Sequence, residues 1–498
     1  MKGNVYLWTA ALLLFAVSIT GCSLLDGLNP TPTPETTPLP TLPPPATSAP
    51  TPEPNEIVQL LPYHPFDPNA DAVAKRLSEA TGTALRFVML PETGATEQLS
   101  IELSVGIEYD LITLTPGQYH GLADKNVWTP LGDRMAQAPD LAAVYTDEEW
   151  GAAMVDGALL GIPQFPARFV DEGIVINATV AEELDISAPQ TPADLKSALR
   201  TVKKETDLIP LTGSGSILRP IMSGFGLGAQ WTATDKSFAN WVQSERFEEY
   251  LKYMADLYED GLIDIDWGEN TAETAAAKQD AGEAFAAVRR WDNPAKIQEG
   301  QQAIALAPLA RDGKRVYEAG TAPDGFVVIP TTCADPDSVV AYLNRRAQSD
   351  MIVLAAVGAE GLQHERQGED YVPLAGFADW RNARAFALAT PTAMMTDLFE
   401  CAVRFDTEVF AAYQGFNEGM ADALVPSPVG YAPPSAALEG LTATLSQIVD
   451  AYFLEVLTGE KAVGKTFDSF TEQWLADGGK LVIEEYAAWK FGEPEPQS

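Results

Sequence analysis

From residue 56 onward, hydrophobic and polar positions repeat with two alternating periods. The segment 57–63 (IVQLLPY) is apolar enough for a buried strand, and the segment 69–81 places Val73, Leu77 and Ala80 on one face of a helix that Gly82 ends. Strands and helices alternate in this way along most of the chain. The same patterns predict further strands at 84–90, 110–114, 173–176, 303–307 and 326–329, and further helices at 97–105, 247–258, 338–348 and 438–457.

This alternation predicts the fold class. Strands separated by helices form parallel βαβ units, and the ligands of such sheets bind at the carboxyl ends of the strands. A chain of 498 residues is also too long for one compact core. We therefore expect an α/β protein with two lobes between residues 56 and 494.

The charge of the chain narrows the classes of partner. Asp and Glu total 70 against 32 Lys and Arg, so the formal net charge is −38. Nucleic-acid binding requires clustered basic residues, and an anionic membrane surface repels an acidic chain. We therefore expect no nucleic-acid partner, no polyanionic substrate and no electrostatic association with a membrane. A hydrophobic content of 46% is still sufficient for substantial cores.

The N-terminal 55 residues differ in composition from the rest. Residues 1–21 carry Lys2 and an apolar run over 5–19, which is shorter than the roughly 20 residues of a spanning helix and typical of an export signal. The letters ITGC at 19–22 resemble the lipobox of bacterial lipoproteins, so Cys22 is the expected lipidation site; a plain secretory signal is the alternative. Residues 22–55 contain eleven prolines and no Lys or Arg, which favours an extended spacer behind the lipid anchor.

Eight segments, taken in chain order, carry a family resemblance. They are AKRLSEATGTALRF (74–87), QLSIELSVGIEYDLITLTPG (98–117), WTPLGD (128–133), DGALLGIPQFP (156–166), PQTPADLKSAL (189–199), GFVVIPTTCADPDSVVAYLN (325–344), GAEGLQHE (358–365) and LEVLTGEKAVGKTFDSFTEQWLADGGKLVIEEY (454–486). Together they resemble the bacterial extracellular solute-binding proteins of sugar-type ABC importers. The resemblance implies a periplasmic-binding-protein-like fold with a ligand cleft between hinge-linked lobes, lobe I at about 56–168 and 320–400 and lobe II at about 169–319 and 401–490.

The resemblance also implies a function. Members of this family capture a small solute by closure of the lobes and deliver it to the permease of an ABC importer, so we expect a receptor anchored by lipid on the extracellular face of the cell membrane. An oligosaccharide is the expected solute. The resemblance implies no catalysis and no cofactor. A surface hydrolase acting on carbohydrate, and a sensor or adhesion protein with the same fold, are the alternatives.

Sugars bind through aromatic rings and planar polar groups, which directs the search for ligand-binding residues. The segment RRWDN at 289–293 follows a helix-like run, AGEAFAAV, and places Trp291 beside Arg290 and Asp292. For Trp291, Phe165 and Trp231, packing within their own lobe is the alternative. The other candidates lie at predicted strand ends, turns or glycine-rich segments, and they are His64, Thr115, Gln118, Gln164, Phe165, Arg168, Ser214, Trp231 and Asp324.

Signals for nucleotide or catalytic metal binding are weak. The segment 459–466 matches the phosphate-binding pattern G-x-x-x-x-G-K-[ST]. That motif needs a preceding strand, whereas the apolar residues before this segment repeat with a helical period. The three histidines, His64, His120 and His364, show no spacing typical of metal ligands. We therefore expect neither a nucleotide nor a metal site.

Two further features concern acidic residues and cysteines. The segment 264–269 (DIDWGE) lacks the ligand pattern of a calcium loop, so we expect a solvated turn that ends a helix. Cys333 and Cys401 are 68 positions apart, which suits either one disulfide in an oxidising compartment or two independent buried thiols. Both alternatives stay open at the level of sequence.

Overall fold

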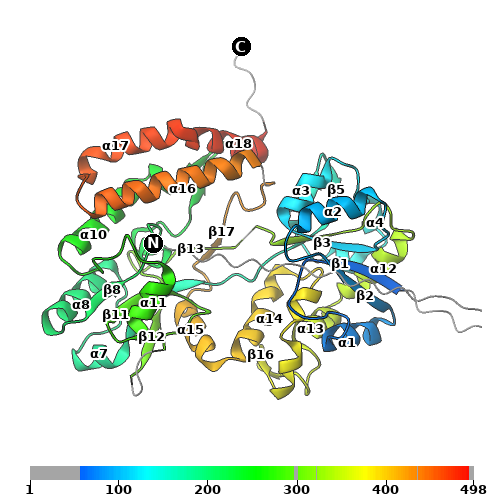
Figure 1. Ribbon diagram of the computed structural model, residues 1–498, viewed down its shortest axis with the longest axis horizontal. Coiled ribbons are helices and arrows are strands. Elements are labelled where there is room, and N and C mark those ends of the chain that lie inside the picture. The colour runs from blue at the N-terminus through cyan, green and yellow to red at the C-terminus, as the bar shows by residue number, and fades with distance from the viewer. Residues whose placement is uncertain (1–55, 297–300, 321, 434–435, 493–498) are drawn as a thin grey trace, which may run out of the picture. The chain divides into compact units, whose positions relative to one another are not determined.

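The computed structural model describes residues 56–296, 301–320, 322–433 and 436–492 (Figure 1). The predicted export signal, Cys22 and the spacer at 22–55 lie outside these residues. The described chain contains two main β-sheets, each covered by helices and each with its own hydrophobic core. We call them lobe I and lobe II. The predicted α/β class with two lobes is thereby confirmed.

Lobe I is built on five strands in the order β2-β1-β3-β14-β6. Strand β1 runs parallel to β2 and β3, and β14 runs antiparallel to both β3 and β6. The carboxyl ends of β1, β3 and β6 therefore lie along one edge of the sheet, next to the start of β14. The strands are β1 (Glu56–Leu61), β2 (Ala84–Met89), β3 (Leu111–Leu114), β6 (Ile162–Gln164) and β14 (Gly325–Val328).

The first helix of lobe I shows why the sequence pattern was informative there. Helix α1 (Ala72–Thr81) begins where Asp71 accepts a hydrogen bond from the backbone of Val73, and it ends at Gly82, whose φ of 67° suits glycine. Its apolar face is buried, as predicted. The remaining helices of lobe I are α2 (Ala95–Ser104), α3 (Pro116–Ala123), α4 (Gly132–Met135), α5 (Pro139–Ala142), α6 (Asp147–Gly151), α12 (Pro336–Arg346), α13 (Ser349–Val357) and α14 (Thr392–Arg404), with the short 3₁₀ turns η3 (Ala375–Trp380) and η4 (Ala383–Phe386).

Lobe II is built on four strands in the order β12-β7-β11-β8. Strand β7 is antiparallel to β11 and β12, and β11 is parallel to β8. The strands are β7 (Glu172–Asn177), β8 (Ile209–Thr212), β11 (Ala284–Arg290) and β12 (Ala303–Leu306).

One sequence prediction in lobe II is wrong. The helix-like run AGEAFAAV lies mostly in β11, a central strand. Strand β11 has a neighbouring strand on each side, and its residues from Ala284 to Ala287, which include Phe285, are all buried, so apolar residues occupy both of its faces. Such a strand does not show the two-residue alternation that distinguishes strands from helices.

Long helices cover the sheet of lobe II, and the last three pack as one group in Figure 1. The predicted helix at 438–457 lies within α16, so the phosphate-binding pattern at 459–466 follows a helix and not a strand. The helices are α7 (Ala178–Glu183), α8 (Pro192–Glu205), α9 (Arg219–Met222), α10 (Glu245–Glu259), α11 (Ala272–Asp280), α15 (Thr407–Asn417), α16 (Ala436–Leu457), α17 (Val463–Trp474) and α18 (Lys480–Phe491), with a π-helical turn, η5 (Leu475–Gly479), between the last two and short turns η1 (Ser223–Phe225) and η2 (Trp241–Gln243).

Within the described residues the chain passes between the lobes at three places: between β6 and β7, between β12 and β14, and between α14 and α15. In the crossing between β12 and β14, the short strand β13 (Tyr317–Ala319) runs parallel to β17 (Leu424–Pro426), which follows α15. The expected lobe boundary near residue 400 falls inside α14, because Leu398 and Cys401 pack in the same core of lobe I.

The remaining short pairs are β4 (Met154–Val155) with β5 (Ala158–Leu159), β9 (Trp231–Ala233) with β10 (Phe238–Asn240), and β15 (His364–Gln367) with β16 (Asp370–Pro373).

Candidate functional site

A hollow of about 430 Å³, lined by polar and apolar side chains, lies at the edge of the lobe I sheet where β1, β3 and β6 end and β14 begins. This is the position at which open α/β sheets bind ligands. Four of the predicted residues, which are far apart in the sequence, come together here: His64, Thr115, Gln164 and Asp324. The other residues that line the hollow are Pro62, Phe66, Thr113, Leu114, Gly325, Arg381, Asn382, Arg384 and Ala385. We call this the strand-end hollow.

Gln164 is held at the floor of the strand-end hollow by backbone contacts. Its Nε2 donates to the backbone carbonyl of Ala387 at 2.7 Å, and the backbone carbonyl of Gln164 accepts from the backbone N–H of Asp324 at 2.9 Å. A side chain at Gly325 would bring a Cβ within 2.7 Å of Gln164 Oε1, so this strand start tolerates only glycine without a shift. The amide is therefore positioned before any ligand arrives.

His64 and Thr115 contribute groups that form hydrogen bonds without a fixed charge. Partial burial lowers the pKa of His64, so its imidazole is neutral near pH 7 and has one donor and one acceptor nitrogen. Its ring centroid lies 5.3 Å from that of Phe66, which adds an apolar surface. Thr115 caps α3, because its hydroxyl accepts from the backbone N–H of Gln118 at 3.3 Å.

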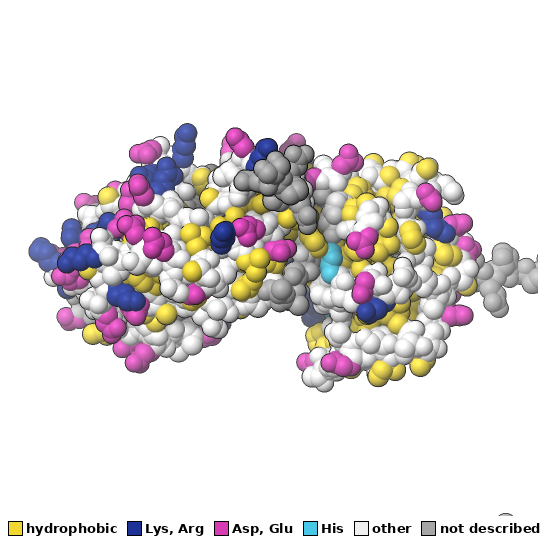
Figure 2. Space-filling view, turned by 90° about the horizontal axis from the view of Figure 1, so that it is seen from above, with side chains coloured by type: hydrophobic (Ala, Val, Ile, Leu, Met, Phe, Trp, Pro, Cys, Tyr) yellow, Lys and Arg dark blue, Asp and Glu magenta, His cyan; other side chains and the backbone are white. Residues whose placement is uncertain are grey.

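Two arginines of the segment 381–385 bring positive charge to the hollow. Arg384 forms an ion pair with Asp324, and the exposed fractions of the two side chains, 71% and 40%, mean that water screens this pair. Arg381 is exposed and, among the described residues, makes no side-chain hydrogen bond or ion pair. On the face drawn in Figure 2, acidic side chains are spread widely, as the net charge requires. Arg381 is thus an unpaired cation in a strongly acidic chain.

The sequence reasoning missed the segment 381–385. The letters DWRNARAF at 379–386 place a tryptophan beside arginine and asparagine, which is the criterion that selected 289–293. Applied evenly, the same criterion would have selected both segments. The sequence gives no sign that a segment so far along the chain returns to the ends of β1 and β3.

Three predicted residues are committed to packing in lobe I. Gln118 is buried and its Oε1 accepts from the backbone N–H of Thr115 at 3.0 Å, so it completes the cap of α3. Phe165 is 2% exposed, with its ring 5.2 Å from that of Tyr145. Arg168 is half-buried, with its Nη2 3.4 Å from the hydroxyl of Tyr431. None of the three is among the residues that line the strand-end hollow.

Two predicted residues lie within lobe II. Trp231 is 7% exposed and packs edge-on against Tyr486 in the core, as the packing alternative expected. Ser214 lies in the turn after β8 and is half-buried. The structure does not bring either side chain to the strand-end hollow.

The segment 289–293 also lies apart from the lining of the strand-end hollow. Trp291 is half-buried, and its ring packs edge-on against Phe169 at 5.4 Å and Phe399 at 5.3 Å. Arg290 and Asp292 are exposed and pair with each other at 3.2 Å. We call the rings of Trp291, Phe169, Phe399 and Tyr413 the aromatic cluster. The role of these three residues in ligand binding stays a prediction.

Buried acidic and thiol groups have structural partners. The expectation of a solvated turn at 264–269 is wrong for Asp264, which is 3% exposed and accepts hydrogen bonds from Thr212 and Lys278, both at 2.7 Å. Burial alone would raise the pKa of Asp264, but these hydrogen bonds lower it. Cys333 and Cys401 are both free and buried, so of the two alternatives the structure has independent thiols.

A search of the described residues finds no group of three or more His, Cys, Asp or Glu side chains arranged to hold a metal ion. The same residues contain no helix that is both long and apolar enough to cross a bilayer.

Known proteins share this architecture. No family model matches the chain. An uncharacterized protein in the butB 5′ region of Niallia circulans is 26% identical over 251 residues, 48% of this chain and 98% of that protein. The polygalacturonan/rhamnogalacturonan-binding protein YtcQ of Bacillus subtilis (strain 168) is 20% identical over 452 residues, 85% of this chain and 89% of that protein.

Solved structures extend the comparison. An HMO-binding, ABC-transporter-associated solute-binding protein from Bifidobacterium longum infantis superimposes with a TM-score of 0.64 at 15% identity, covering 88% of this chain and 98% of that one. At this identity the match demonstrates a shared fold. The chain therefore has the fold of the solute-binding proteins of ABC transporters, as the sequence resemblance predicted.

Proposed function

We propose that this protein is a receptor that binds an oligosaccharide at the strand-end hollow and delivers it to the permease of an ABC importer. The observation that carries the proposal is the meeting of His64, Thr115, Gln164 and Asp324 at the ligand-binding edge of the lobe I sheet. The names of the similar proteins support it, since YtcQ is described as polygalacturonan/rhamnogalacturonan-binding and the Bifidobacterium protein as HMO-binding.

The chemistry of the strand-end hollow suits sugar hydroxyls. Gln164 and the neutral imidazole of His64 each offer a donor and an acceptor, the Asp324 carboxylate accepts, and Phe66 offers an apolar face for C–H groups. Closure of lobe II over the solute, with backbone changes confined to the three crossings, is the expected capture step. We infer that no reaction is catalysed, so the solute leaves unchanged.

We further infer that the oligosaccharide is acidic. Arg381 has no carboxylate partner among the described residues, and the Arg384–Asp324 pair is screened by water and easily exchanged. A guanidinium binds a carboxylate with two parallel hydrogen bonds, which is the arrangement a uronate offers. The polygalacturonan named for YtcQ is a polymer of such sugars.

We also propose that Cys22 anchors the protein to the extracellular face of the cell membrane, with 22–55 as the spacer. The lipobox-like letters at 19–22 support this location. If Cys22 carries the lipid, Cys22→Ser transfers the protein from the membrane fraction to the soluble fraction of expressing cells. Retention of the variant in the membrane fraction would contradict the anchor without touching the proposed solute.

Calorimetric titration of the full-length protein with tri-galacturonate and with a neutral trisaccharide tests the proposed solute. A ligand at one hundred times its dissociation constant adds about 2.7 kcal/mol to the free energy of unfolding, which a thermal shift also detects. Arg384→Gln and Arg381→Gln should weaken binding of tri-galacturonate, because each removes a cation from the strand-end hollow. Arg86→Gln is the matched control. It breaks an exposed ion pair with Glu56 at the start of β1, away from the strand-end hollow, and should not weaken saccharide binding.

Three results would change the proposal. Consumption of the saccharide would favour the hydrolase alternative. Binding of the neutral and acidic trisaccharides with equal affinity would retain the receptor and remove the preference for uronate. Binding of tri-galacturonate that survives both arginine substitutions would place the site elsewhere.

A further inference from the structure

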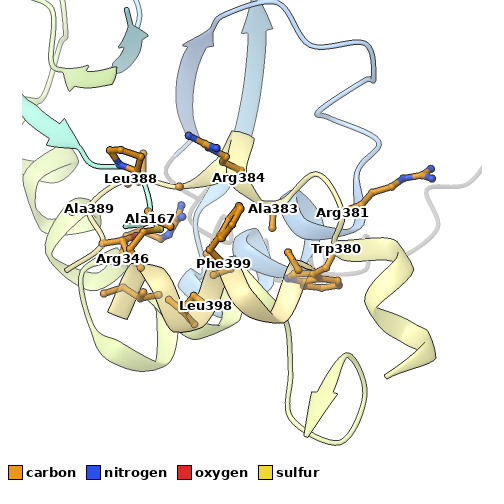
Figure 3. Close-up of a pocket in the computed structure, with 18 residues that line it drawn as sticks. Ala167, Arg346, Trp380, Arg381, Ala383, Arg384, Leu388, Ala389, Leu398 and Phe399 are labelled. Atoms are coloured by element: carbon orange, nitrogen blue, oxygen red, sulfur yellow. The ribbon is translucent and has the colours of Figure 1, made fainter. Parts of the chain in front are cut away.

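A second pocket, of about 220 Å³, lies in lobe I between α13, α14 and the segment 380–390 (Figure 3). Its lining is mostly apolar and, among the described residues, includes no acidic side chain. Figure 3 shows Phe399 pointing into the space, whereas Arg381 and Arg384 at its rim point away from it. We call this the α13–α14 pocket. It differs from the strand-end hollow in its chemistry, because aliphatic and aromatic carbons form most of its wall.

The charged residue inside this wall is Arg346, at the end of α12. The residue is 5% exposed and lines the pocket at the end where Figure 3 places Ala167 and Ala389. Its Nη1 donates to the hydroxyl of Tyr342 at 2.8 Å and its Nη2 donates to the carbonyl of Phe386 at 2.7 Å. Its Nε is buried and has no hydrogen-bond partner, and within the described part of the chain Arg346 forms no ion pair.

A buried cation with these partners is incompletely satisfied. Arginine keeps its charge at all physiological pH values, so it cannot escape the cost of burial by losing a proton. Two neutral acceptors offset only part of that cost, and a buried N–H without a partner adds to it. The guanidinium has five N–H groups, of which two donate to these acceptors, so the missing component is an anion, and the pocket that Arg346 lines is the space from which an anion would come.

We propose that the α13–α14 pocket binds a small molecule with an apolar body and one carboxylate, whose oxygen accepts a hydrogen bond from the guanidinium of Arg346. The volume sets the size of this ligand. An apolar cavity of roughly 150 Å³ holds benzene, so 220 Å³ has room for a phenyl ring and a short acidic tail. The wall supplies the contacts for the ring, with Trp380, Leu388 and Phe399 among them.

This proposal is independent of the proposed oligosaccharide. A sugar carries hydroxyls around its whole ring, and the α13–α14 pocket offers no set of polar groups that could replace the lost water around them. A phenylalkanoate has the opposite distribution, with one charged end and an apolar body. The two ligands therefore suit different sites in the same lobe.

The test compares 3-phenylpropanoate with 3-phenylpropanol in calorimetric titrations of the full-length protein. The two molecules have nearly the same shape, and only the acid can pair with a guanidinium. We expect the acid to bind about tenfold more tightly or better, as a charge-assisted hydrogen bond implies. Arg346→Met should reduce this preference to near one, because the alcohol and the acid then meet the same apolar wall.

A second variant keeps the test decisive if Arg346→Met fails to fold. Ala356→Phe places a ring in the pocket from α13 and leaves Arg346 intact, so it should abolish binding of the acid. Ala393→Phe introduces the same ring at an exposed position of α14 that does not line the pocket, and it should bind the acid as the unaltered protein does. Equal affinity for acid and alcohol, absence of acid binding, or acid binding that survives Ala356→Phe would each overturn the proposal.

Discussion

Replacing Trp291 with alanine distinguishes two roles for the segment that looked most like a sugar platform in the sequence. In the structure its indole belongs to the aromatic cluster, with ring centroids 5.4 Å from Phe169, 5.3 Å from Phe399 and 6.3 Å from Tyr413. If packing is its main role, Trp291→Ala lowers the free energy of unfolding and leaves saccharide affinity nearly unchanged.

The magnitude follows from these contacts. Each aromatic pair contributes about 0.5–1.5 kcal/mol beyond the burial of its area, and truncation of a fully buried Trp costs about 3–5 kcal/mol. Trp291 is only half-buried, so we expect a loss of about 2–4 kcal/mol. Trp291→Phe keeps a ring within the cluster and should lose less than half as much.

Urea unfolding followed by far-ultraviolet circular dichroism measures the stability, and titration with a bound saccharide measures the affinity. Circular dichroism is preferred because the substitution removes a fluorophore. A variant that keeps its unfolding midpoint and loses saccharide binding would refute the packing argument. That result would instead establish the stacking role that the sequence predicted for Trp291.

Three further predictions concern buried polar groups. Burial lowers the pKa of His120 to about 4 from its usual 6.5, so protonation of His120 opposes folding. The free energy of unfolding should therefore fall by up to about 3 kcal/mol as the pH drops from 6.5 to 4. His120→Gln should remove that part of the pH dependence. An equal pH dependence in the variant would contradict this. Asp264→Asn should cost about 2–4 kcal/mol in urea unfolding, because it leaves Lys278 without its buried partner; a loss below 1 kcal/mol would contradict the network. Burial raises the pKa of Cys333 to about 11 and of Cys401 to about 12, so in Cys22→Ser both thiols should resist alkylation at pH 8 until urea is added, and rapid modification of the native protein would contradict their burial.

The pattern of the sequence predicted much of the first half of lobe I. Helix α1 combines an apolar face with a cap at each end, so local signals and burial agree, and its predicted end at Gly82 is correct. Thr115 lies at the ligand edge of the sheet because it directly follows β3, and His64 lies just beyond the end of β1. Gln164 was predicted because it follows the Gly-Ile-Pro turn, where the family resemblance implies that the chain crosses near the cleft. Asp324 joins them because β14 runs antiparallel and begins at that edge.

Local pattern was less informative where neighbours distant in the sequence decide burial. Strand β11 appeared helical because its consecutive residues from Ala284 to Ala287 are all buried, on both faces of the sheet, and periodicity detects only the contrast between a buried and an exposed face. Phe165 and Trp231 have aromatic rings of the kind that stack on sugars, but both rings are buried. Whether a ring faces a ligand or a core depends on the element packed over it.

The sequence by itself determined the alternation of strands and helices, the two-lobed class and the strand-end positions of the candidate site. Only the tertiary structure brought Arg381 and Arg384 to the ends of strands more than 200 residues earlier, separated Trp291 from that site, and enclosed Arg346 beside an apolar pocket. The physical reason is that a local sequence sets the face on which a side chain emerges, whereas its partner, its exposure and the satisfaction of its charge depend on segments brought together by folding.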